Sequence, residues 1–117
     1  MTPTNPVLRH TSTMLERAGR KQKAPIWTEA SFMLAGPTKN RVQVNLGRIS
    51  RLTDEGDAVF VPGKVLGTGL IGRKRIIGAF AFSASARSKI EATGGSALSV
   101  EEFLNKYPKG SGVKLVK

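Results

Sequence analysis

An excess of positive charge is the feature that most limits how this chain can fold. Its 117 residues include 19 Lys and Arg but only 8 Asp and Glu, a formal net charge of +11. Self-repulsion of this size opposes compaction, so a polyanionic partner is the natural explanation for the excess. The charge is uneven, because residues 1–53 contain nine basic and two acidic residues, whereas residues 54–117 contain ten and six.

The composition excludes several classes of function. A hydrophobic content of 39% with 13 glycines is typical of a packed globular protein, and the length suits one domain. The absence of cysteine excludes disulfides, thiolate zinc sites and a cysteine nucleophile, and a single histidine excludes multi-histidine metal sites. There is no signal-peptide pattern at the start and no apolar run near the roughly 20 residues that span a bilayer. We therefore expect a soluble intracellular protein without a membrane partner.

The first part of the chain is predicted to be a basic, mainly helical N-terminal arm over residues 1–44. Apolar residues recur at helical spacing from Val7 to Ala18, which predicts a helix that ends at Gly19. A second helix is predicted over residues 25–35. The alternation at 42–44 indicates a short strand or an extended segment.

The remaining residues, 45–117, alternate between strand and helix patterns. Asn45 is predicted to cap a short helix, Ser83 another, and Ser99 with Glu102 forms a capping box for a third. This alternation predicts an α/β fold, an irregular layered core of strands and helices preceded by the helical arm, in a single structural domain. The predicted strands are 58–61, 64–66, 75–82 and 113–116, with a turn at Pro62-Gly63.

One motif points to an enzyme. The segment Gly67-Thr68-Gly69-Leu70-Ile71-Gly72 matches G-x-G-x-x-G, which in dinucleotide-binding folds turns from a strand into a helix. Here a basic cluster and an apolar strand pattern follow instead, so a glycine-rich turn between two strands is the better interpretation. The acids are scattered and His10 has no obvious catalytic partner, so we expect no enzymatic activity, no cofactor and no small-molecule substrate.

The basic residues suit a protein that contacts a folded RNA. They are spread over several segments, and this distribution favours phosphate contacts from several sides rather than sequence-reading of DNA. The cluster Arg73-Lys74-Arg75 is predicted at the tip of the glycine turn, either as a phosphate contact or as a solvated tip without a partner. All five phenylalanines are predicted to lie in the core. Trp27 is left open between the core and a contact with nucleic acid.

Several blocks of sequence resemble a known family. They are NLGRI at 45–49, VPGKVLGTG at 61–69, FSASA at 82–86, KIE at 89–91 and GG at 94–95. In order and spacing they resemble the archaeal and eukaryotic large-subunit ribosomal protein eighteen-e family, which is related to bacterial large-subunit ribosomal protein fifteen. The short chain resembles the archaeal members.

The resemblance implies a structural protein of the large ribosomal subunit in the cytoplasm. It also implies that large-subunit ribosomal RNA and neighbouring large-subunit proteins are the partners, and that the glycines form turns of the core. The alternative is a free-standing nucleic-acid-binding or DNA-compacting protein. Charge and motif matches together predict these RNA-contacting residues: Arg9, His10, Arg17, Arg20, Lys21, Lys23, Trp27, Lys39, Arg41, Asn45, Arg48, Arg51, Lys64, Arg73, Lys74 and Arg75.

Overall fold

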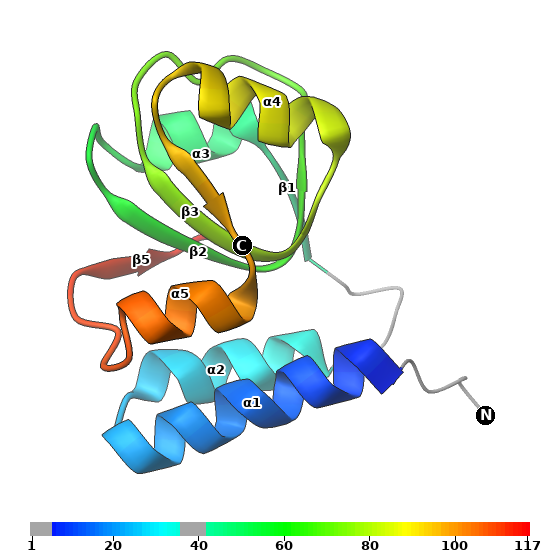
Figure 1. The fold of residues 1–117 in the computed structure, drawn as a ribbon, viewed down its shortest axis with the longest axis vertical. Coiled ribbons are helices and arrows are strands. Elements are labelled where there is room, and N and C mark those ends of the chain that lie inside the picture. The colour runs from blue at the N-terminus through cyan, green and yellow to red at the C-terminus, as the bar shows by residue number, and fades with distance from the viewer. Residues whose placement is uncertain (1–5, 36–41) are drawn as a thin grey trace.

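The computed structural model describes residues 6–35 and 42–117, and it begins with two helices that pack side by side (Figure 1). These are α1 (Pro6–Gln22) and α2 (Pro25–Leu34). The prediction that α1 ends at Gly19 is wrong, because the helix continues to Gln22. Gly19 instead permits close contact with α2, since a Cβ there would lie 2.9 Å from the backbone nitrogen of Thr28.

The end of α1 is a left-handed turn at Lys23, whose φ is 53°. The backbone N–H of Ala24 donates to Gly19 O at 2.9 Å, and that of Lys23 donates to Arg20 O at 3.4 Å. This pair of bonds is the Schellman arrangement, which usually has glycine at the left-handed position. The chain therefore reverses sharply into α2 through a lysine.

Five strands form one parallel sheet in the part of the chain that the structure describes. Strand β2 pairs with β3 along one edge, and β3 pairs with β4. The other edge of β2 is shared, with β5 beside its first residues and β1 beside its last. Of these strands, β4 was not predicted. The strands are β1 (Val42–Asn45), β2 (Ala58–Leu66), β3 (Ile76–Phe82), β4 (Ser96–Leu98) and β5 (Val113–Leu115).

The predicted turn at Pro62-Gly63 is wrong, because β2 passes through both residues as one strand. Its register against β3 shifts between Val61 and Lys64, as expected where proline cannot donate to the ladder. Gly63 faces β1 so closely that a Cβ there would lie 2.8 Å from the carbonyl carbon of Val42. A bulge, rather than a turn, absorbs the two residues.

Three further helices follow the strands, and each begins at the predicted cap. They are α3 (Leu46–Leu52), α4 (Ala84–Ala92) and α5 (Val100–Lys106). The side chains of Asn45 and Ser83 each accept a backbone N–H of the first turn. The capping box of α5 is complete, with Ser99 and Glu102 each accepting a backbone N–H of the other.

Helices cover both faces of the sheet (Figure 1). Side chains alternate along β2, so Val59 and Val61 pack beneath α3 and α4, whereas Ala58 and Phe60 pack toward α1, α2 and α5. Leu15 of α1 is fully buried in this second cluster. The α/β fold with a helical N-terminal region is therefore confirmed. No helix among the described residues is both long and apolar enough to cross a bilayer.

The aromatic residues divide between interior and surface. Phe60 and Phe103 are fully buried, and their ring centroids lie 5.4 Å apart. Phe80 and Phe82 are partly buried, each against a different core cluster. The core prediction is wrong for Phe32, which is 82% exposed on α2.

Candidate nucleic-acid interface

The parallel order of the strands brings the motif segments together. β1 ends at Asn45, β2 at Leu66 and β3 at Phe82, and the carboxyl ends of parallel strands meet at one edge of a sheet. The segments 45–49 and 82–86, far apart in sequence, therefore adjoin the loop that follows β2. We call this region the sheet edge.

Glycines let the loops at the sheet edge lie directly on one another. The backbone N–H of Gly47 donates to Thr68 O at 3.2 Å. Gly69 has a φ of +91°, and a Cβ there would lie 2.7 Å from the nitrogen of Gly47. A Cβ on Gly67 would overlap the side chain of Ser85. Gly67 and Gly69 thus act as close-packed turn residues.

The dinucleotide interpretation fails on its structural context. The glycine motif leads from β2 through a loop into β3, so no helix begins behind it. A Cβ added at Gly72 would have no atom within 4 Å, and its φ lies outside the left-handed region, so Gly72 lacks the close packing of Gly67 and Gly69. The motif is a loop of the sheet edge.

Four cations belong to elements that meet at the sheet edge, and we call Arg48, Arg51, Lys64 and Lys89 the sheet-edge cluster. All four are exposed. Arg48 Nε donates to the backbone oxygen of Lys117 at 3.0 Å, and Lys89 Nζ donates to Gly67 O at 2.7 Å. A guanidinium nitrogen of Arg51 lies 3.6 Å from the Cβ position of Gly47. The cluster therefore surrounds the glycine loops with positive charge.

Two cations near the sheet edge were not among the predicted contacts. Lys89 also donates to Gly69 O at 3.3 Å, so it holds the glycine loop from α4. Helical spacing could have found it, because Lys89 follows Ser85 by four residues and both face the same loop. The guanidinium of Arg87 lies 5.3 Å from the ring centroid of Phe82.

The predicted contact Asn45 has a structural use at this edge. Its side-chain oxygen accepts the backbone N–H of Arg48 at 2.8 Å and so caps α3. One lobe of the amide is therefore committed to the helix end. The side chain positions α3, which in turn presents Arg48 and Arg51.

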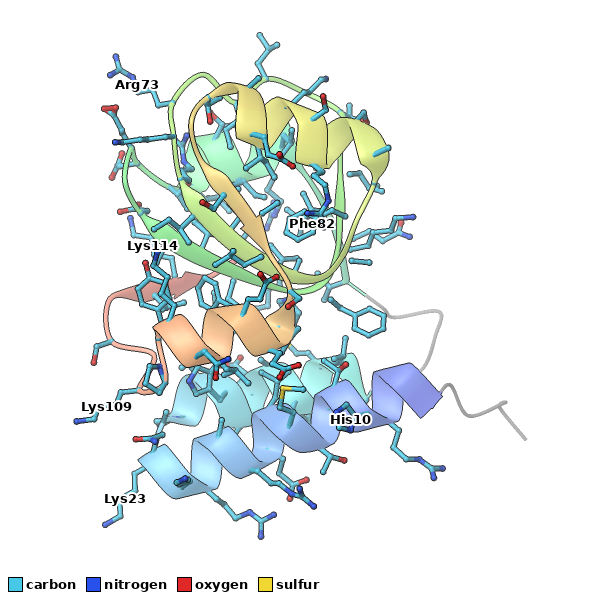
Figure 2. All side chains as sticks on the ribbon, viewed as in Figure 1. His10, Lys23, Arg73, Phe82, Lys109 and Lys114 are labelled. Carbon is cyan, nitrogen blue, oxygen red and sulfur yellow. The ribbon has the colours of Figure 1, made fainter. Side chains whose placement is uncertain are left out.

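The second group of candidates lies on α1 (Figure 2), where His10 and Lys23 mark opposite ends of the helix. Arg20 forms an ion pair with Glu16 at 3.2 Å. Arg9, Arg17 and Lys21 line a groove between α1 and α5 with a volume of about 800 Å³. All six candidates on α1 and the following turn are exposed: Arg9, His10, Arg17, Arg20, Lys21 and Lys23.

The cluster at 73–75 does not lie at the tip of the glycine turn, and this prediction is wrong. Because β2 and β3 are parallel, the connecting chain must return to the opposite end of the sheet before β3 begins. Arg73 is accordingly found beside the turn that precedes β2, where it pairs with Glu55 at 3.3 Å. The backbone N–H of Gly56 donates to Lys74 O at 2.8 Å. Arg73 and Lys74 stay exposed at this site.

Arg75 and Trp27 do not serve as surface contacts. Arg75 is 5% exposed, and its guanidinium donates to Thr53 Oγ1 at 2.7 Å and to Thr53 O at 2.9 Å. Trp27 is fully buried, and its Nε1 donates to Pro108 O at 3.0 Å. Its ring packs edge-on against Phe60, with 5.2 Å between centroids. Lys39 and Arg41 lie outside the described residues.

Most acids of the described residues are already paired with cations. Glu16, Glu29, Asp54, Glu55 and Asp57 each pair with a Lys or Arg. The 2.7 Å hydrogen bond from Lys114 lowers the pKa of Asp57, and the same bond raises the pKa of Lys114. Many exposed cations in the described ranges form no ion pair, among them Arg9, Arg17, Lys21, Lys23, Arg51, Lys64 and Lys74.

The chain is similar to known ribosomal proteins. A family described as the ribosomal proteins 50S-L15 and 50S-L18e, together with their 60S counterpart, matches residues 43–98, which run from β1 to β4 and include the sheet edge. The protein named large ribosomal subunit protein eL18 from Methanococcus maripaludis is 42% identical over 113 residues, covering 97% of this chain and 94% of the relative.

Relatives with the same name occur in other archaea. The protein from Pyrobaculum aerophilum is 40% identical over 97% of this chain and 93% of its own length. That from Methanoregula boonei is 40% identical over 97% of this chain and 94% of its own length. The resemblance inferred from the motif blocks is thereby confirmed. With this identity along nearly the whole chain, the protein belongs to the eL18 family of ribosomal proteins, within the L15 and L18e group.

Proposed function

We propose that this protein is a structural constituent of the large ribosomal subunit that binds large-subunit ribosomal RNA and has no enzymatic activity. Its place is the cytoplasmic ribosome, beside other proteins of the large subunit. The observation that carries the proposal is the positive charge without ion-pair partners on exposed residues of the described fold. Relatives named for the large subunit support the assignment.

The mechanism is charge neutralisation by cations held at fixed positions. RNA segments repel one another, and a folded protein that presents cations on two faces lets separate segments approach. The sheet-edge cluster presents Arg51 and Lys64 beside loops whose glycines have no side chain to keep an RNA backbone away. The α1 face presents Arg9, Arg17 and Lys21 on another side. Arg75 and Trp27 have interior roles and are left out of the proposed contacts.

Salt dependence and competition test the proposal together. The purified chain should bind large-subunit ribosomal RNA with an affinity that falls steeply between about 50 and 200 mM KCl, with a slope of about 0.9 per phosphate neutralised. Duplex DNA should compete poorly, because the cations are positioned for a folded RNA. Equal affinity for generic duplex DNA would favour the alternative, a free-standing DNA-compacting protein.

A pair of variants locates the contact. Arg51→Gln with Lys64→Gln removes two cations without ion-pair partners at the sheet edge, and the salt slope should fall by about 1.8. Lys106→Gln with Lys109→Gln removes the same charge elsewhere, and Figure 2 shows Lys109 far from Phe82 at the end of β3. The control should change the slope much less. Equal changes would mean that net charge alone drives binding.

Cell fractionation tests the assembly itself. A tagged chain expressed in its own cells should sediment with large subunits on a sucrose gradient and stay there after a wash at moderate salt. Recovery in the light fractions alone would contradict the proposed role, whatever the purified chain binds.

A further inference from the structure

The groove between α1 and α5 combines two kinds of lining. Arg9, Arg17 and Lys21 stand along one rim on α1. Met14 lies between them in the groove, and Leu104 of α5 lines it as well. A site with a charged rim and an apolar floor fits a ligand that is itself charged on one side and apolar on the other.

The rim is built for a row of anions. Arg9, Arg17 and Lys21 are separated by eight and four residues, so they share one helix face at spacings of about 12 and 6 Å. None of the three forms an ion pair in the described ranges, and all are exposed. One acid, Glu101, lines the groove from α5, so the groove keeps a clear excess of positive charge.

The floor is built for flat apolar groups. Met14 and Ala18 pack against the core cluster, and Leu104 is 8% exposed. Thioether sulfur makes favourable contacts with aromatic rings, and the face of any nucleobase is such a ring. A volume of about 800 Å³ is within the usual range of small-molecule clefts, so it can admit an extruded base.

We propose that the α1–α5 groove binds an unpaired segment of RNA, with phosphates at Arg9, Arg17 and Lys21 and a base against Met14. This inference rests on the proposed RNA-binding function and adds the class of RNA that this face selects. A paired RNA keeps its bases inside the helix, so it reaches the rim and leaves the floor empty. An acidic peptide likewise satisfies only the rim.

The test measures binding of the full chain to labelled probes. They are an oligoadenylate of about eight nucleotides, an abasic oligomer with the same phosphates, an RNA duplex, and a polyglutamate peptide. The oligoadenylate should bind at least about fivefold more tightly than the abasic oligomer, because base stacking on the floor is lost in the latter. Equal affinity of these two probes overturns the inference, and so does tighter binding of the duplex or of polyglutamate.

Matched variants separate the groove from general charge. Arg17→Gln with Lys21→Gln should weaken oligoadenylate binding about tenfold and lower its salt slope by about 1.4. Lys106→Gln with Lys109→Gln makes the same charge change outside the groove lining and should alter binding less than about threefold. Equal losses in the two variants overturn the inference, and circular dichroism checks that both remain folded.

The proposed function fails separately. If the wild-type chain binds large-subunit ribosomal RNA but the groove variant retains full oligoadenylate affinity, only the groove assignment is wrong. If the wild-type chain binds neither RNA, the proposed function itself is wrong.

Discussion

At the scale of single residues, Arg73 and Arg75 show how two neighbouring cations take opposite roles. Burying a charge is unfavourable unless hydrogen bonds compensate it. Arg75 has that compensation, because its guanidinium donates to Thr53 and to Arg73 O at 3.0 Å. It therefore ties the start of β3 to the end of α3. Arg73 extends outward and pairs with an exposed carboxylate.

Replacing these residues should separate stability from RNA binding. Arg75→Ala leaves the buried oxygens of Thr53 without this donor, so the free energy of unfolding should fall by about 2–4 kcal/mol. Arg73→Ala removes one exposed ion pair and should change it by less than about 0.5 kcal/mol. Urea denaturation of both variants measures the difference. A neutral Arg75→Ala would show that this guanidinium has no structural role.

At the scale of elements, the loops of the sheet edge depend on particular glycines rather than on the motif as a whole. Gly69→Ala places a side chain at a φ of +91° and within 2.7 Å of Gly47 N, so the free energy of unfolding should fall by more than about 2 kcal/mol. Gly72→Ala meets open space and should stay within about 0.5 kcal/mol. Urea denaturation compares the two. Equal losses would mean that the loop does not pack against Gly47.

The capping box of α5 gives a pH-dependent prediction. Glu102 accepts the backbone N–H of Ser99, and this hydrogen bond lowers the pKa of Glu102. The stabilisation is therefore complete above the unfolded-state pKa of about 4.3 and is lost as pH falls through the lower folded-state value. Ser99→Ala should lower the free energy of unfolding by about 1 kcal/mol at pH 7.

The control for the cap is Ser88→Ala, an exposed site on α4 away from any cap. The deficit of Ser99→Ala relative to the wild type should shrink as the pH is lowered below about 4, because protonation of Glu102 removes half of the box in the wild type too. Denaturation at several pH values measures this. A deficit that grows in acid would contradict the proposed contribution of Glu102.

At the scale of the whole molecule, the net charge of +11 should have opposite effects on the free chain and on its complex. Salt screens self-repulsion, so raising KCl from about 50 to 500 mM should raise the melting temperature of the free protein. The same change should dissociate the RNA complex through counterion competition. Calorimetry and filter binding on one preparation measure both. A free chain destabilised by salt would mean that its ion pairs outweigh its repulsion.

The local features of the fold could be predicted because they depend on residues near one another in sequence. Caps at Asn45, Ser83 and Ser99 follow from side chains that accept backbone N–H groups three positions ahead. The closing strand at 113–115 follows from its apolar pattern. β4 was missed because Ser96–Leu98 has only three residues, too few to show a period.

The candidate site could be predicted only in part. Charge alone found Arg9, Arg17, Lys21, Arg51 and Lys64, all of which are exposed. It also included Arg75, because a basic residue in an apolar flank looks the same whether it faces water or a buried carbonyl. Phe32 was placed in the core for the converse reason, since a helical apolar stripe does not say which neighbour will cover it.

The sequence by itself determined the surplus of cations, the α/β class, the helix caps and the family, because composition, short-range hydrogen bonding and ordered motifs are properties of the chain. Only the tertiary structure decided that β2 and β3 are parallel, which carries residues 73–75 away from the glycine loop. Only it decided that Trp27 and Arg75 are interior and that α1 and α5 form a groove. Strand pairing and burial depend on contacts between distant segments, so the surplus of cations was divided between interior and surface only when the chain had folded.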